Sequence, residues 1–229
     1  MKNRPLIKAG YIGILMLLFG IILMNIFPKN AHMAEGFKTP VIFFEFANNI
    51  QETQKFFGIT DGQNIPDKHL IQQMNLGNKI DFIYAFVYAL FLFLFARKIK
   101  QISKKKIFSG VMFLAISAFV SDVFENINLL QITSKITTGD FQHQLSMLHI
   151  FTWMKWGSLA IGFALLSKWF YDQKSWQRII APLCWMPVVL AGLSYYFRGA
   201  NNEYFSLSVM SCFIILVIHS FVYSTRKKV

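Results

Sequence analysis

The chain has 229 residues, of which 55% are hydrophobic, 17% aromatic and 15% charged, with a formal net charge of +12. A soluble domain has about 25% charged residues, and the apolar residues here gather in long runs, so this composition excludes an ordinary soluble domain. The positive charge does not indicate nucleic-acid binding, because Lys and Arg form short groups at the ends of the apolar runs, as in membrane proteins. We therefore expect a lipid bilayer as partner and no nucleic acid.

The first apolar run covers residues 9–27 and follows a short basic segment. It is too long for the apolar part of an ordinary signal peptide, and no clear small-residue cleavage site follows it. We expect a retained membrane anchor, long enough to cross the bilayer as a helix.

Residues 28–78 form the largest segment expected outside the membrane. Thr39 can cap a helix that has Pro40 at its first position, and apolar residues then recur at helical spacing as far as Gly58. This pattern predicts an amphipathic helix lying on the membrane surface or over the bundle. A second short helix is predicted from Asp67 to Leu76, ended by a glycine.

Five further apolar runs approach or reach the length of about 20 residues that spans a bilayer. They cover residues 79–97, 107–130, 147–168, 179–197 and 204–224. The sequence thus predicts an all-α fold, a polytopic transmembrane helical bundle of about six spans with an external amphipathic helical segment after the first. We expect residues 1–229 to form a single integral membrane domain.

The distribution of Lys and Arg predicts the orientation of the bundle. These residues are concentrated in the N-terminal segment, in the second-to-third and fourth-to-fifth connections, and at the C-terminus. The connections on the other side carry fewer of them over more residues. The positive-inside rule then predicts a multipass protein of the bacterial inner (cytoplasmic) membrane with both termini in the cytoplasm.

The sequence gives no indication of a cofactor or a metal site. The two cysteines, Cys184 and Cys212, lie in different apolar runs at different expected depths, so we predict free, buried thiols rather than a disulfide. No zinc-ligand spacing, HExxH motif or nucleotide-binding glycine motif is present.

Polar residues inside the predicted spans are the candidates for function, because burying an ionisable group costs about 2.5–3.5 kcal/mol on insertion scales. They fall on spans two, three and four, toward the outer side, and one residue of the external helix lies over the same region. The candidate functional cluster is Glu45, Asp81, Tyr84, Tyr88, Asp122, Glu125, Asn126, His149 and Lys155.

Lys155 is expected near the middle of its span, so we predict that it pairs with an acid of the third span. Simpler roles remain open for the acids. Asp81 can cap a helix that begins near Asn78, and the acids of the third span can mark the place where that helix enters water. An ion pair that only holds the bundle together is a further alternative.

A resemblance supports this grouping. Thr39-Pro40, Phe44-Glu45-Phe46-Ala47, Asp81-Phe82-Ile83-Tyr84 with Tyr88, and Asp122-x-x-Glu125-Asn126 occur in that order between residues 39 and 126. With these motifs in this order, the chain resembles an uncharacterised family of small bacterial multipass inner-membrane proteins. The resemblance implies that these acids and Asn126 belong together, and it implies no activity.

We expect an inner-membrane protein that binds or passes a small or lipid-like molecule through a polar pocket near the periplasmic face. Two alternatives stay open. One is a membrane-embedded enzyme that acts on lipid through carboxylate general acid/base chemistry, with Asp122 or Glu125 as base and His149 or Lys155 as acid or electrostatic stabiliser. The other is an accessory subunit of a membrane complex. The sequence identifies no protein partner.

Overall fold

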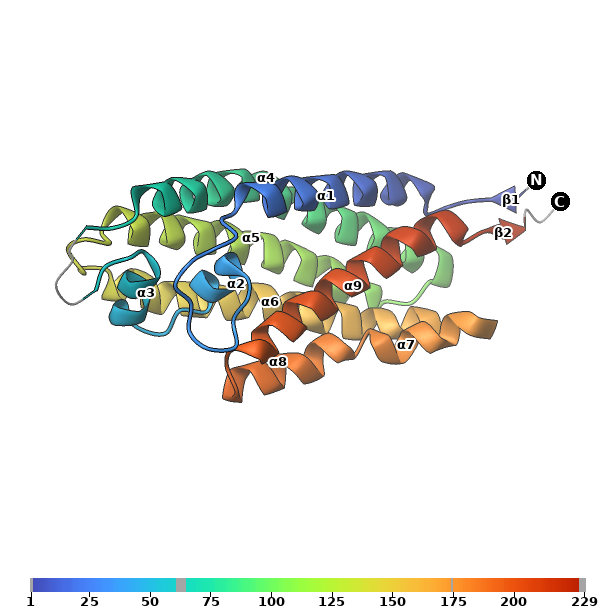
Figure 1. Cartoon of the computed structure of the whole chain (residues 1–229). Coiled ribbons are helices and arrows are strands. Elements are labelled where there is room, and N and C mark those ends of the chain that lie inside the picture. Colours follow the sequence, from blue (N-terminus) through green and yellow to red (C-terminus); the bar gives the residue numbers. More distant parts are fainter. Residues whose placement is uncertain (1, 61–64, 174, 227–229) are drawn as a thin grey trace.

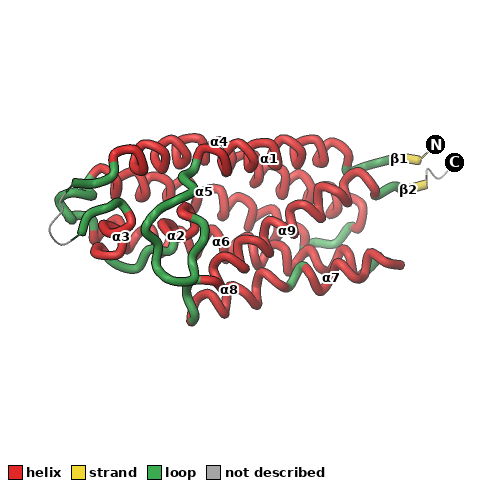
Figure 2. Tube along the Cα trace, in the orientation of Figure 1, coloured by secondary structure: helices red, strands yellow, loops and turns green. Residues whose placement is uncertain are grey.

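The computed structural model describes residues 2–60, 65–173 and 175–226, and these residues are helical apart from short loops and one pair of two-residue strands (Figure 2). The helices are α1 (Ile7–Ile26), α2 (Pro40–Glu45), α3 (Ile50–Phe56), α4 (Lys68–Ser103), α5 (Phe108–Ser134), α6 (Gln142–Tyr171), η1 (Ser175–Ile179), α7 (Ile180–Leu183), α8 (Met186–Tyr196) and α9 (Ala200–Val222). The strands β1 (Lys2–Asn3) and β2 (Thr225–Arg226) pair antiparallel and join the two ends of the chain.

Among the residues that the structure describes, six helical segments are long and apolar enough to cross a membrane. They are α1, α4, α5, α6, residues 177–196 and α9. The predicted six-span helical bundle is therefore confirmed. In Figure 1 the long helices run alongside one another, and both termini lie at one end of the bundle, which we call the termini end. The opposite end carries α2 and α3, and we call it the cap end.

Helix α4 is longer than the crossing of a bilayer requires. Its 36 residues correspond to about 54 Å at 1.5 Å per residue, against about 30 Å of hydrocarbon. The prediction of a separate helix over residues 67–76 was wrong, because these residues belong to the first part of α4. Asp67 caps α4 by accepting hydrogen bonds from the backbone N–H groups of His69 and Leu70.

Gly77 does not end a helix as predicted but lies inside α4, where it allows close packing. A Cβ atom at this position would lie 2.3 Å from the ring of Phe27, which follows α1. The missing side chain therefore lets the end of α1 approach the α4 backbone.

Between Thr39 and Gly58 the cap contains two short helices, whereas one helix was predicted there. Pro40 does occupy the first position of α2, but the helix ends at Glu45. Asn49 caps the start of α3, because its side chain accepts a hydrogen bond of 2.8 Å from the backbone N–H of Glu52. Helix α2 contacts α5, α6 and α9, so the cap lies over the bundle.

The fifth span, predicted over 179–197, covers residues 177–196, but its helix is interrupted by a turn. It consists of η1, α7 and α8, with a break at Cys184 and Trp185. Pro182 and Pro187 lie on either side of the break, and proline has no backbone N–H to donate. The break separates the part of the span near the termini end from α8.

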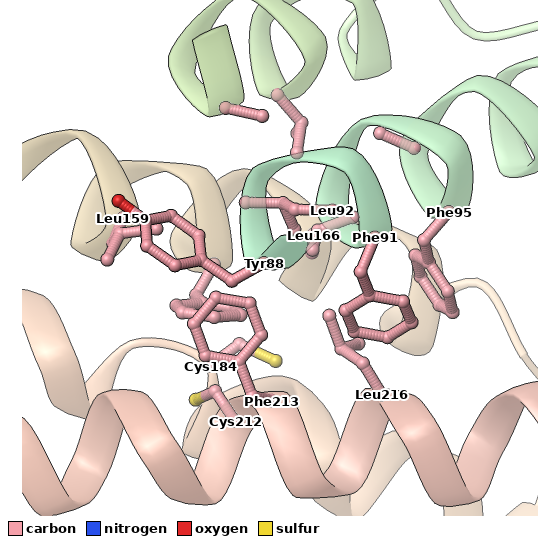
Figure 3. Packing of buried hydrophobic residues seen from close by; sticks show 14 of the residues in the cluster. Tyr88, Phe91, Leu92, Phe95, Leu159, Leu166, Cys184, Cys212, Phe213 and Leu216 are labelled. Atoms are coloured by element: carbon pink, nitrogen blue, oxygen red, sulfur yellow. The ribbon is translucent and has the colours of Figure 1, made fainter. Parts of the chain in front are cut away.

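Two apolar clusters stabilise the fold. The bundle core joins the spans, and Figure 3 shows Tyr88 and Phe91 of α4 facing Phe213 of α9. The cap core is formed by α2 and α3 with the cap ends of α4, α5 and α6, and it contains Phe43, Phe44, Phe56 and Phe57 among others. Cys184 and Cys212 belong to the bundle core and are free and buried, as predicted. The expected difference in their depths is wrong, because the Cys212 thiol lies 3.8 Å from the backbone oxygen of Leu183, next to Cys184.

Candidate functional site

Lys155 is the centre of a buried cluster of charged groups. It lies 13 residues after the first residue of α6, about 20 Å along the helix, and is 5% exposed. Its ammonium nitrogen lies 3.1 Å from Glu45 Oε1 and 4.0 Å from Asp122 Oδ1, and it also forms an ion pair with Glu125. The predicted pairing of Lys155 with an acid of the third span is therefore present.

Asn126 connects a further acid to this centre. Its side-chain N–H group donates to Asp81 Oδ2 at 2.8 Å and to Asp122 Oδ1 at 3.0 Å. The other oxygen of Asp122 accepts a hydrogen bond of 2.7 Å from the Tyr88 hydroxyl. A continuous polar network thus runs from Asp81 on α4 through α5 to Lys155 on α6.

The cap closes the network through Glu45, the last residue of α2. In addition to its ion pair with Lys155, Glu45 accepts a hydrogen bond of 2.9 Å from the indole N–H of Trp156. The hydroxyl of Thr152 contacts Glu125 Oε1 and lies 3.2 Å from the backbone oxygen of Glu45. The Lys155 ammonium also lies 5.1 Å from the centre of the Trp156 ring, a cation–π contact.

Helix geometry explains why these groups meet. Asp122, Glu125 and Asn126 share one face of α5, because residues three and four apart are neighbours on a helix. Asp81 lies 13 residues from the start of α4, and Asp122 lies 12 residues from the end of α5, so both lie about 20 Å from the cap-end termini of their helices. Lys155 has the same depth in α6, and α5 packs against both α4 and α6.

The cluster lies where the bundle core meets the cap core. Trp153 and Trp156 pack against both apolar clusters, and Glu125 is fully buried. Low polarity around the charges disfavours ionisation of an unpaired carboxyl group. At Glu45, which lies outside the spans, burial raises the pKa above its ordinary value, although Lys155 opposes this shift.

Two of the simpler roles considered for the acids do not fit the structure, whereas an ion pair that holds the bundle together stays open. Asp81 lies inside α4 rather than at its start, so it does not cap a helix beginning near Asn78. Asp122, Glu125 and Asn126 do not mark an exit into water, because each is at most 2% exposed.

Two predicted site residues lie at the edge of the cluster or outside it. Tyr84 is half-buried and packs edge-on against Tyr88, with ring centres 5.6 Å apart. His149 is exposed and lines a surface hollow of about 320 Å³ at the cap end, beside Ala47 and Asn48. It therefore does not contact the acids.

Thr152 was missed by the sequence analysis, although its hydroxyl contacts an acid of the cluster. The signal was its position three residues before Lys155, which puts both side chains on one face of α6. Threonine is common in membrane helices, and its hydroxyl can bond to its own backbone, so the residue type alone carries little information.

In the part of the chain that the structure describes, no group of three or more His, Cys, Asp or Glu residues is arranged to hold a metal ion. The ammonium of Lys155 occupies the place among the carboxyl groups where a cation would lie.

Comparisons with family models, with curated proteins and with solved structures find no match to this chain. The six apolar helices define the class, an integral membrane protein of the multipass helical type.

Proposed function

We propose that this protein binds or passes a small or lipid-like molecule that carries a basic group, and that the acid cluster around Lys155 holds this group. On this proposal Asp81, Asp122, Glu125 and Glu45 bind the basic part. Tyr84, Tyr88, Trp153 and Trp156 provide the apolar contacts. The positive-inside distribution of Lys and Arg supports a bacterial inner membrane with the termini in the cytoplasm, which makes the cap end periplasmic.

The observation that carries the proposal is the excess of carboxyl groups over cations. Among the described residues of the cluster, three carboxyl groups pair with the single ammonium of Lys155, and a fourth, that of Asp81, is joined to them through Asn126. In a medium of low dielectric, these carboxyl groups cannot all be ionised unless a second cation binds; otherwise some of them carry protons. A basic ligand group would replace the protons, so its binding is an exchange of cation for proton.

Access to the cluster requires movement of the cap. Glu45 is the last residue of α2 and covers the cluster from the cap side. The surface hollow beside Ala47 and His149 lies next to this helix. A displacement of α2 would join the hollow to the acids. His149 lies six residues before Lys155 on α6, about 9 Å along the helix, and it would line the entrance.

The test is mass spectrometry of the small molecules and lipids that co-purify with the protein. We expect a discrete basic molecule with the wild type, its loss from Glu125→Gln, which removes one of the acids that hold it, and its retention by Lys155→Met, which removes only a competing cation. The matched control is Asp140→Asn, which removes an exposed acid at the cap end and should keep the molecule. If all four proteins carry the same molecules, the charge of Glu125 does not hold the molecule, and the binding proposal fails.

The same variants separate binding from the enzymatic alternative. A general base that becomes Gln stops turnover while the substrate still binds, so an enzyme with Glu125 as base would retain its molecule in Glu125→Gln. A binding site that uses the charge of Glu125 would lose it.

A further inference from the structure

A second site lies at the termini end, far from the acid cluster. A surface groove of about 580 Å³ runs between the end of α6, the start of α5 and the broken fifth span. Figure 1 shows α7 beside the last turns of α6 at this end. The apolar walls of the groove are formed by Ile107, Ala164, Leu165, Ala181, Pro182 and Trp185.

The break in the fifth span shapes this groove. Ala181 and Pro182 belong to α7, and Trp185 lies at the break itself. The indole N–H of Trp185 donates a hydrogen bond of 3.1 Å to the hydroxyl of Ser167 on α6. This bond satisfies the polar atom of the ring and leaves its apolar face for contact with a hydrocarbon chain.

Basic side chains line one end of the groove. Lys168 and Arg178 belong to its wall, and both residues are exposed. Lys168 forms an ion pair of 3.1 Å with Asp172, which also pairs with Lys105. These hydrogen bonds hold the pKa of Asp172 below its ordinary value. One carboxylate thus pairs with two lysines, and with Arg178 added, positive charge is in excess here.

The groove thus has an apolar part that can contact an acyl chain and a cationic end that can bind the phosphate of a phospholipid. Tyr171 and Trp185 are the amphipathic aromatic residues typical of the membrane–water interface. Basic pockets between transmembrane helices bind anionic headgroups, and each basic residue near an anionic surface contributes about 1 kcal/mol.

We propose that this groove binds an anionic phospholipid, with the headgroup phosphate on Lys168 and Arg178 and an acyl chain along α6 and α7. The site is independent of the acid cluster, so it stands or fails separately from the proposed function. It would order a lipid against the break of the fifth span.

The test is native mass spectrometry of the delipidated full-length protein in detergent, with phosphatidylglycerol and phosphatidylethanolamine as probes. We expect the wild type to prefer phosphatidylglycerol by at least about tenfold, and the double variant Lys168→Gln/Arg178→Gln to bind it about thirtyfold more weakly, since two basic residues are removed. The matched control is Arg97→Gln/Lys100→Gln, which removes the same charges from the termini end without touching the groove, and it should bind like the wild type.

Equal binding of the two lipids by the wild type, or an equal loss in both double variants, would overturn the proposal. Inorganic phosphate is the third probe. If phosphate alone binds the wild type and displaces the lipid, the site recognises a free anion and not a lipid.

The place of the acyl chain has its own readout. With about one brominated phosphatidylglycerol per protein, a chain in the groove quenches indole fluorescence by contact with Trp185, and Trp185→Phe should lose that part of the quenching. The same fractional quenching in both proteins would place the lipid elsewhere.

Discussion

Lys155 and Glu45 form an ion pair of 3.1 Å that joins one of the six long apolar helices to a short helix of the cap. Lys155 belongs to α6 and Glu45 to the cap helix α2. Any change in the charge of the cluster therefore also changes how firmly the cap is held. This coupling is the basis for a site that opens when its cation or its protons are exchanged.

Removing the ammonium of Lys155 should destabilise the protein strongly. Lys155→Met leaves the buried carboxyl groups without their cation, and loss of one partner of a buried ion pair costs about 3–5 kcal/mol. Equilibrium unfolding in mixed micelles measures this change. The double variant Lys155→Met/Glu125→Gln should lose less than the sum of the two single variants, because it also removes an uncompensated acid. Additive losses would mean that the two groups are not coupled.

The stability of the cap should depend on pH through Glu45. Burial raises the pKa of this carboxyl group in the folded protein, so the folded state holds the proton more tightly than the unfolded state. The resulting stabilisation is fully present below the unfolded pKa and is lost as pH rises through the folded pKa.

The variant Glu45→Gln is neutral at every pH, so it should gain stability relative to the wild type as pH rises. Thermal unfolding of both proteins from acidic to neutral pH measures this difference. Asp140→Asn is the control for an exposed acid. A constant difference between Glu45→Gln and the wild type at all pH values would contradict the expected role of Glu45.

The start of the cap should be anchored by Glu203 of α9. Its carboxylate accepts hydrogen bonds from the backbone N–H groups of Lys38 and Thr39, at 2.9 and 2.8 Å, and from the Thr39 hydroxyl at 2.6 Å. Glu203→Ala leaves these donors unpaired at a cost of about 1–3 kcal/mol, and Thr39→Val should cost about 1 kcal/mol. Hydrogen exchange should rise in α2 more than in the bundle half of α4. Unchanged exchange in α2 would show that Glu203 does not hold the cap.

Gly77 and Gly157 make a matched pair for the packing of the helices. Gly77→Ala places a methyl group against the ring of Phe27, where a Cβ would lie 2.3 Å from the nearest atom, and overpacking of this kind costs about 1–3 kcal/mol. Gly157 is also inside a helix, but nothing lies within 4 Å of its Cβ position. Gly157→Ala should stabilise α6 by about 0.5–1 kcal/mol. Thermal unfolding of both variants should show shifts of opposite sign, and shifts of the same sign would contradict this packing.

The sequence was sufficient for the features that depend on composition and spacing. Long apolar runs predicted six spans, because about 20 apolar residues cross a bilayer as a helix whose backbone groups bond to one another. The i, i+3, i+4 spacing of Asp122, Glu125 and Asn126 put them on one face, and topology brought Asp81 and Lys155 to the same level. Only the structure could show that Glu45 reaches Lys155, since this contact depends on how a loop folds back over the bundle.

Element boundaries were less predictable, because tertiary contacts decide them. Gly77 is a typical end of a helix in sequence terms, yet the packing of Phe27 keeps it inside α4. The break near Cys184 and Trp185 lies between two prolines, but hydropathy alone does not separate a kinked span from a broken one. The position of His149 outside the cluster reflects helix rotation, which the depth of a residue in its span does not determine.

The release of the co-purified molecule on acidification tests the central claim most directly. Protons and a basic ligand group compete for the same carboxyl groups around Lys155, so lowering the pH to about 5, toward the ordinary carboxyl pKa range, should release the molecule while circular dichroism shows that the protein stays folded. A basic molecule released by acid from the wild type, and absent from Glu125→Gln at any pH, is the predicted result. A neutral or anionic molecule, or one retained equally at both pH values, would contradict the account.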